Sequence, residues 1–404
     1  MAAPKNAKTD RLLQMTQVIR HLSQEIGGRG SCTENERKAG EYLAGLLRSL
    51  DVQDVRLESF QAVPSTYWPY GLAFALALAG SLASLLFGAS GALVLGAIFN
   101  ALGFIGMLAE TELATSWTHW FLPRLESQNV LGVIPPTGEV QRTALVCAHL
   151  DTHRTPIFYS SKKWHTLFSL LVGLTLVSMA AGAIVFGLSA YLDWAPARWF
   201  ALALVPIQGF ALVMCLHADF TPYSPGANDN ASGAAVAVGL AHQLTRQPLT
   251  NTQVYLLLTG CEEVGDWGMR AFLNEHAARL GDEVFYLIID QVGVGGIRYL
   301  TADGLFLKHK THPHALQVAQ GVAAQLPELG AQAMTGLAYT DALKATQRGL
   351  RALTICNVPL NGAGAGSHWH QMSDTPDQIA LPDLDKTFQF ACEVLQFIDR
   401  SPAQ

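Results

Sequence analysis

The sequence predicts an α/β protein whose sheet carries helices on both faces and whose chain is interrupted by two apolar helical hairpins. Predicted strands alternate with predicted helices over most of the chain, which is typical of α/β sheets. Half of the 404 residues are hydrophobic and only 14% are charged, against roughly 25% in average soluble domains. The shortage of charge is local, because residues 59 to 109 carry none and residues 164 to 218 carry only Asp193 and Arg198.

The overall composition excludes two classes of protein. With a mean hydropathy of +0.23, the chain is too apolar to be disordered. It has 26 Lys and Arg against 32 Asp and Glu, a net charge of −6, so it lacks the basic surface of a nucleic-acid-binding protein. The six cysteines form no C-x-x-C pair. We therefore expect no redox motif and interpret them as small buried hydrophobic residues.

The N-terminal region predicts two helices followed by a strand. Residues 9 to 26 carry apolar side chains at helical spacing and end at a glycine pair. Thr33 and Glu36 form a capping-box signature that opens the second helix. Residues 52 to 60 alternate between apolar and polar side chains, as strands do.

Each apolar block is long enough to hold two membrane helices of about 20 residues. The predicted spans cover residues 68–87, 93–112, 165–192 and 199–217. Helices of soluble proteins rarely stay apolar on every face over such lengths. We therefore interpret the blocks as two transmembrane hairpins with four spans. The alternative is that they are buried core helices of a soluble protein.

Polar side chains gather where the remaining predicted strands end. Open α/β sheets place their sites at the carboxyl ends of strands. Acidic groups that follow apolar strands are costly to bury without a cation or another partner. Imidazole and carboxylate groups together suit zinc. The strands 143–148, 254–259 and 284–289 are followed by His149 and Asp151, by Glu262 and Glu263, and by Asp290, while Asp229 lies in a turn and His370 in a glycine-rich loop.

In this order, the motifs resemble those of the co-catalytic zinc exopeptidases, a family that includes secreted bacterial aminopeptidases, glutamate carboxypeptidase and glutaminyl cyclase. The resemblance covers most of residues 8–66 and 125–400 and implies a mixed sheet sandwiched by helices. The matching segments are Ala148–Asp151, Gly226–Gly233, Gly260–Gly265, Ile289–Asp290, and Trp369–His370 followed by Asp374 and Thr375.

The resemblance implies two zinc ions per chain and assigns a ligand to each matching position. His149 and Asp290 would hold one ion. Glu263 and His370 would hold the other. Asp229 would bridge both ions.

Three further residues receive roles from the resemblance. Glu262 would be the general base, acting on a water that bridges the two metals. Asp151 would orient His149, because metal-bound histidines usually donate their other N–H. Aminopeptidases of this family carry a tyrosine before the last histidine, where its hydroxyl stabilises the oxyanion. Here Trp369 takes that position, as in glutaminyl cyclases, so its indole N–H becomes the candidate donor.

The sequence therefore predicts a membrane-embedded di-zinc aminopeptidase, a zinc metallopeptidase that hydrolyses N-terminal residues from peptides. The expected partners are a peptide substrate and membrane lipid, with no nucleic acid, and no feature indicates an oligomeric state. Two alternatives stay open. Trp369 suggests a glutaminyl-cyclase-like zinc acyltransferase, and the same fold could also serve as a non-catalytic receptor.

The predicted catalytic domain consists of three parts, residues 1–66, 124–163 and 219–404. The hairpins occupy residues 67–123 and 164–218. We expect a multi-pass integral protein of the plasma or inner membrane. Basic residues flank the second hairpin, and the positive-inside rule then favours a cytoplasmic catalytic domain. Free cysteines and the lack of a signal-peptide pattern agree with this orientation.

Overall fold

The computed structural model describes residues 5–359 and 368–401, without the side chains of residues 5–7. The chain divides into two compact units. The body consists of Met1–Pro64, Leu125–His153 and Tyr223–Gln404. The helical unit consists of Ser65–Arg124 and Arg154–Pro222.

The described part of the body contains a nine-stranded mixed sheet, as expected for the predicted fold class. The strand order is β1-β2-β4-β3-β5-β9-β6-β7, and β8 pairs with β6. The central strands β4, β3, β5 and β9 are parallel to one another. The pairs β1–β2, β2–β4, β9–β6 and β6–β7 are antiparallel, whereas β8 is parallel to β6. The strands are β1 (Gln53–Ala62), β2 (Leu125–Ile134), β3 (Arg142–His149), β4 (Thr252–Thr259), β5 (Phe285–Ile289), β6 (Gly296–Asp303), β7 (His309–Lys310), β8 (Gln332–Thr335) and β9 (Arg351–Val358).

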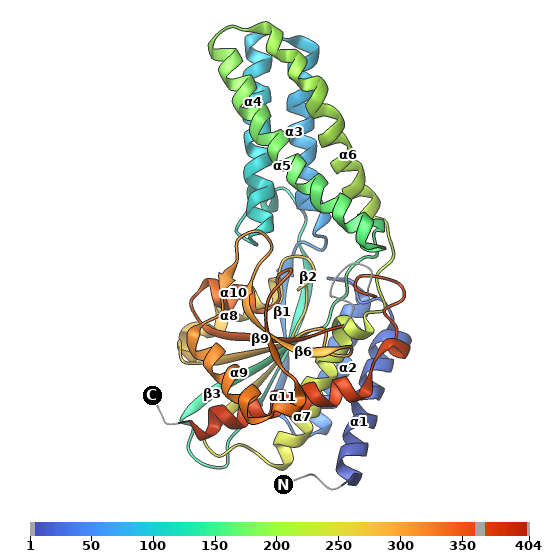
Figure 1. Ribbon diagram of the computed structural model, residues 1–404, viewed down its shortest axis with the longest axis vertical. Coiled ribbons are helices and arrows are strands. Elements are labelled where there is room, and N and C mark those ends of the chain that lie inside the picture. The colour runs from blue at the N-terminus through green and yellow to red at the C-terminus, as the bar shows by residue number, and fades with distance from the viewer. Residues whose placement is uncertain (1–4, 360–367, 402–404) are drawn as a thin grey trace. The chain divides into compact units, whose positions relative to one another are not determined.

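Helices cover both faces of this sheet (Figure 1). Alternate residues of β3 point to opposite faces. Val146 packs among the larger group of helices, and Leu145 and Cys147 pack among the smaller group. The larger group is α1 (Lys5–Arg20), α2 (Glu34–Ser49), α7 (Ser232–Arg246), α9 (Pro313–Gln325) and α11 (Leu381–Arg400), and the smaller group is α8 (Trp267–Leu280) and α10 (Ala342–Gln347).

The parallel strands in the centre of the sheet bring distant parts of the sequence together at their carboxyl ends. Residues 144–148 of β3 are all fully buried, as expected for a strand with helices on both faces. β3 pairs in parallel with β4 and with β5, so the three strands end on the same side. The predicted site residues that follow these strands are therefore placed close together.

The helical unit is a bundle of four long apolar helices. They are α3 (Tyr67–Phe87), α4 (Ser90–Thr111), α5 (Lys162–Tyr191) and α6 (Ala201–Asp219). Each of these four segments is long and apolar enough to cross a membrane. Large apolar side chains point outward from α5, for example Leu170, Val177 and Ile184, which are more than half exposed. Such an outer surface suits hydrocarbon better than water.

A ring of polar side chains lies inside the bundle. Ser81 Oγ donates to Gln208 Oε1 (2.9 Å), and Gln208 Nε2 donates to Asn100 Oδ1 (2.8 Å). Asn100 Nδ2 closes the ring by donating to Ser81 Oγ (3.1 Å). All three side chains are fully buried. Hydrogen bonds of this kind stabilise contacts between apolar helices and fix their alignment, here between α3, α4 and α6.

Candidate metal centre

Asp229 stands between two histidines and offers one carboxylate oxygen to each. Its Oδ1 lies 3.3 Å from His149 Nε2, and its Oδ2 lies 3.2 Å from His370 Nε2. His149 is the last residue of β3, Asp229 precedes α7, and His370 lies in the loop before α11. The peptide bond between Asp229 and Asn230 is cis. The structure thus brings together three residues that the sequence predicted as metal ligands.

The other two predicted ligands complete a group on each side of Asp229. Asp290 Oδ1 lies 3.4 Å from His149 Nε2, and Glu263 Oε2 lies 3.2 Å from His370 Nε2. Among the described residues, His149, Asp229 and Asp290 form one set of clustered donor atoms. Glu263 and His370 belong to a second set. The two sets together contain all five residues that were predicted as ligands.

The centre concentrates negative charge in a buried place. Burial raises the pKa of Glu262 well above its usual value and that of Glu263 to about 7. Burial also raises the pKa of Asp290. For Asp229 burial acts in the same direction, but hydrogen bonds with His149 and His370 hold its pKa below the usual value. Neighbouring carboxylates of this kind require a cation to remain ionised together.

The residues present fit zinc. Imidazole nitrogens and carboxylate oxygens are the donors that zinc takes in catalytic sites. His149 Nδ1 donates to the main-chain carbonyl of Asp151 (3.1 Å). This bond leaves Nε2, the nitrogen that faces Asp229 and Asp290, as an acceptor for a metal. In the described part of the chain, Glu263 Oε1 is buried and accepts no hydrogen bond.

Asp151 contacts His149 through its carboxylate and through its carbonyl. Its Oδ1 lies 3.7 Å from His149 Nδ1, within ion-pair distance, and its carbonyl accepts a shorter hydrogen bond from the same nitrogen. The carboxylate also accepts the main-chain N–H groups of Glu262 (3.0 Å) and Glu263 (3.1 Å) and the Ser31 hydroxyl (2.6 Å). These donors occupy both oxygens. Asp151 therefore positions the loop that carries the two glutamates.

Two residues hold the turn around Asp229. The Asp374 carboxylate accepts the N–H groups of Asn228 (2.8 Å) and Asp229 (3.0 Å). Arg29 is fully buried and donates to the carbonyls of Leu150 (2.8 Å) and Gly226 (2.9 Å). Burial lowers the pKa of Arg29 to about 10, although the charge of Asp374 acts in the opposite direction. Arg29 thus ties the segment after His149 to the segment before Asp229.

Sequence reasoning missed His153, which lies in the centre. A ring nitrogen of His153 belongs to the same set of clustered donor atoms as Glu263 and His370. Its ring also stacks on that of His370, with centroids 3.9 Å apart and planes 11° apart. The spacing His149-x-Asp151-x-His153 is a signal that could have found it. Trp369 also lies beside His370, with ring centroids 4.2 Å apart, and its role as oxyanion donor stays a prediction.

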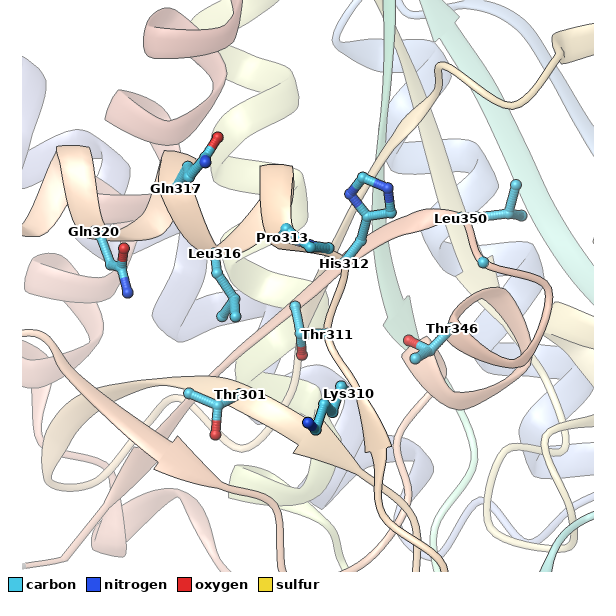
Figure 2. Close-up of a pocket in the computed structure, with 11 residues that line it drawn as sticks. Thr301, Lys310, Thr311, His312, Pro313, Leu316, Gln317, Gln320, Thr346 and Leu350 are labelled. Atoms are coloured by element: carbon cyan, nitrogen blue, oxygen red, sulfur yellow. The ribbon is translucent and has the colours of Figure 1, made fainter.

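A cavity of about 500 Å³ lies elsewhere in the body (Figure 2). It is lined by residues of β6, of β7, of α9 and the residues just before it, and of the end of α10 and the turn after it, including Thr301, Lys310, His312 and Leu316. None of the predicted metal ligands lines it. His312 Nδ1 accepts the N–H of His314 (3.2 Å) and so caps α9. The histidine-rich segment 308–314, which contains His309, His312 and His314, therefore serves the fold at that point.

Part of the chain is similar to a known peptidase family. Residues 206–395, just under half of the chain, match the profile described as peptidase family M28. This match implies a zinc peptidase, with zinc as the metal. A curated relative, the probable lipoprotein aminopeptidase LpqL of Mycobacterium tuberculosis, is 25% identical over 192 residues, which are 46% of this chain and 38% of that protein.

Solved structures share the fold of this chain at low sequence identity. A zinc aminopeptidase of Bacillus subtilis, BSAP, has a TM-score of 0.57 and 13% identity, with 97% of each chain covered. Glutaminyl cyclase of Porphyromonas gingivalis has a TM-score of 0.56 and 15% identity, with 95% of this chain and 97% of that chain covered. Two of the three kinds of enzyme named in the resemblance, an aminopeptidase and a glutaminyl cyclase, therefore share this fold.

The contacts of Asp151 make a prediction about metal affinity. Asparagine offers one acceptor oxygen where two main-chain amides and a hydroxyl now bind, so Asp151→Asn will loosen the Glu262–Glu263 loop. We expect zinc affinity to fall about 10- to 100-fold, measured by competition with a chelator. Ser31→Ala is the matched control, because it removes one bond from the same carboxylate, and it should cost less. If Asp151→Asn bound zinc as tightly as the wild type, Asp151 would not be needed to position the Glu262–Glu263 loop for metal binding.

Proposed function

We propose that this protein is a membrane-embedded di-zinc aminopeptidase, which hydrolyses N-terminal residues from peptides. One observation carries the proposal of two ions. Asp229 directs its two carboxylate oxygens toward two different histidines, at 3.3 and 3.2 Å. Each histidine has a further carboxylate of its own, Asp290 or Glu263. A bridging carboxylate between two such pairs is the arrangement that a two-metal site needs.

The residues of the centre divide the work of hydrolysis. Zinc, when bound here, would polarise the scissile carbonyl and acidify a water molecule. Glu262 is buried among the ligands but is not needed to complete either set, so it is the group that takes up the proton of that water. Asp151 holds the main-chain N–H of Glu262 and thereby fixes where the base stands. Burial keeps bulk water away from these charges.

The separate roles of the two adjacent glutamates can be tested by substitution. Glu262→Gln should keep zinc and lose activity on the order of 10²-fold or more, because the amide cannot accept the proton. Glu263→Ala should lose zinc, because a ligand has gone. Elemental analysis and hydrolysis of an aminoacyl reporter would measure both effects. Equal loss of zinc in the two variants would mean that the roles are wrongly assigned.

A second candidate function is cyclisation of N-terminal glutamine by a glutaminyl-cyclase-like acyltransferase. Trp369 beside His370 favours it, since this residue stands where the aminopeptidases carry tyrosine. The complete set of five ligand residues, including both carboxylates that flank Asp229, favours the aminopeptidase. A peptide that begins with glutamine separates the two functions, because one activity releases free glutamine and the other releases a cyclised peptide.

The location of the enzyme is part of the proposal. The four apolar helices form two hairpins, and each hairpin returns the chain to the side from which it left. The body and the described ends of the chain then lie on one side of the membrane. Arg142, Arg154, Lys162 and Lys163 flank the second hairpin on that side, whereas Arg198 lies at its tip. The positive-inside rule then favours the cytoplasm for the body.

Protease protection tests this orientation. In intact cells the body should resist protease added outside and become sensitive once the membrane is permeabilised. A cleavable tag inserted at Asp193, between α5 and α6, is the control and should be cut from outside. Digestion of the body from the outer face of intact cells would contradict a cytoplasmic location.

A further inference from the structure

Two cysteines from distant parts of the chain meet beside the loop of the proposed base. Cys32 Sγ lies 3.4 Å from Cys261 Sγ. Cys261 is fully buried, whereas Cys32 is partly exposed. Cys261 directly precedes Glu262 and follows β4, and Cys32 directly precedes the cap of α2. Cys32 thereby differs from the sequence interpretation of the cysteines as small buried hydrophobic residues.

One buried carboxylate sets the two cysteines opposite each other. Glu36 Oε2 accepts the main-chain N–H of Cys32 (2.8 Å), and Glu36 Oε1 accepts that of Cys261 (2.8 Å). The Ser127 hydroxyl also donates to Glu36 (2.9 Å). The predicted capping box is only half used, because Thr33 Oγ1 caps Glu36 while the Glu36 carboxylate serves the two cysteines.

Asp151 makes a second, parallel connection between the same two segments. It binds the Ser31 hydroxyl on one side and the N–H groups of Glu262 and Glu263 on the other. The segment 31–32 is thus joined to the loop 261–263 at Glu36, at Asp151 and at the two sulfur atoms. The thiols cannot drift apart unless these hydrogen bonds break.

We propose that Cys32 and Cys261 form an oxidisable dithiol, a modification site at which a hydroperoxide produces a disulfide bond. The Cys32 thiolate attacks the peroxide oxygen, giving a sulfenic acid and an alcohol, or water if the oxidant is hydrogen peroxide. The Cys261 sulfur then displaces the hydroxyl of the sulfenic acid, which leaves as water. The two thiols lose two electrons and two protons, and the hydroperoxide accepts them.

The order of these steps follows from access to the two thiols. Cys261 is fully buried, so its thiol is shielded from oxidants in solution. Cys32 is partly exposed and is therefore the sulfur that an oxidant reaches first. A disulfide bond is roughly 2.05 Å long, so the two sulfur atoms must approach by little more than an ångström.

Formation of the disulfide bond shifts the position of Glu262, the proposed base. Glu36 holds the main-chain N–H groups of both cysteines in place. The two side chains and the peptide that joins Cys261 to Glu262 must therefore move to bring the sulfur atoms together. A displacement of about 1 Å at a catalytic group can cost about 10²-fold in rate. Oxidation should therefore slow hydrolysis without removing metal. This consequence rests on the proposed function, whereas formation of the bond does not.

The first arm of the test concerns the bond alone. The full-length zinc-loaded protein in detergent is treated with hydrogen peroxide, alkylated, digested and analysed by mass spectrometry. We expect a peptide pair linked through Cys32 and Cys261 that has lost two hydrogen atoms and that dithiothreitol separates. Recovery of both cysteines as alkylated thiols after treatment, or of Cys32 linked to another cysteine, would overturn the proposal.

The second arm measures the consequence. Hydrolysis of the aminoacyl reporter should fall at least tenfold on oxidation with zinc content unchanged, and dithiothreitol should restore it. Cys32→Ser should resist oxidation, whereas Cys392→Ser, whose partner Gln243 Nε2 (3.0 Å) a hydroxyl can also bind, should respond like the wild type. A linked but fully active protein would overturn the effect on the base. A reduced protein without any activity would instead refute the proposed function. Formation of the disulfide bond would then be judged by mass spectrometry alone.

Discussion

The centre depends on the sharing of one buried carboxylate between two histidines. Asp229 can face His149 and His370 at once only because Asp374 binds its turn and Arg29 ties the preceding segment to the end of β3. Arg29 also supplies a permanent positive charge among buried acids. Metal binding adds the remaining positive charge, so we infer that the site and its cations stabilise each other.

The body accommodates a long insertion between two of its proposed ligands because the first and last residues of the insertion lie close together. Residues 150–228 separate His149 from Asp229 in sequence, yet the two side chains are in contact. Ser224 N–H donates to the carbonyl of His153 (2.9 Å). This bond joins the point where the chain leaves the body to the point where it returns. A loop whose ends are already neighbours can be lengthened at small entropic cost. The apolar hairpin could therefore enter here without disturbing the carboxyl ends of the strands.

The sequence predicted the central fold well because strong local patterns specify it. Apolar runs such as that in β3 and the helices that follow them appear close to their predicted bounds. The strands β6, β7 and β8, at one end of the sheet, were not predicted. β6 mixes Arg298 and Thr301 with apolar residues and is stabilised by pairing with distant β9. The clustering of the five proposed ligand residues was predictable from motif order. The contacts of Asp151, His153 and the cysteine pair were not, because they join loops whose approach only the tertiary fold determines.

The central claim is that two metal ions lie on either side of Asp229. Diffraction from crystals of the zinc-loaded protein, recorded at the zinc absorption edge, tests this claim most directly. The account predicts two anomalous peaks, one beside His149 and Asp290 and the other beside Glu263 and His370, with the Asp229 carboxylate between them. A single peak, or a peak at the histidine-rich segment that begins α9, would contradict it.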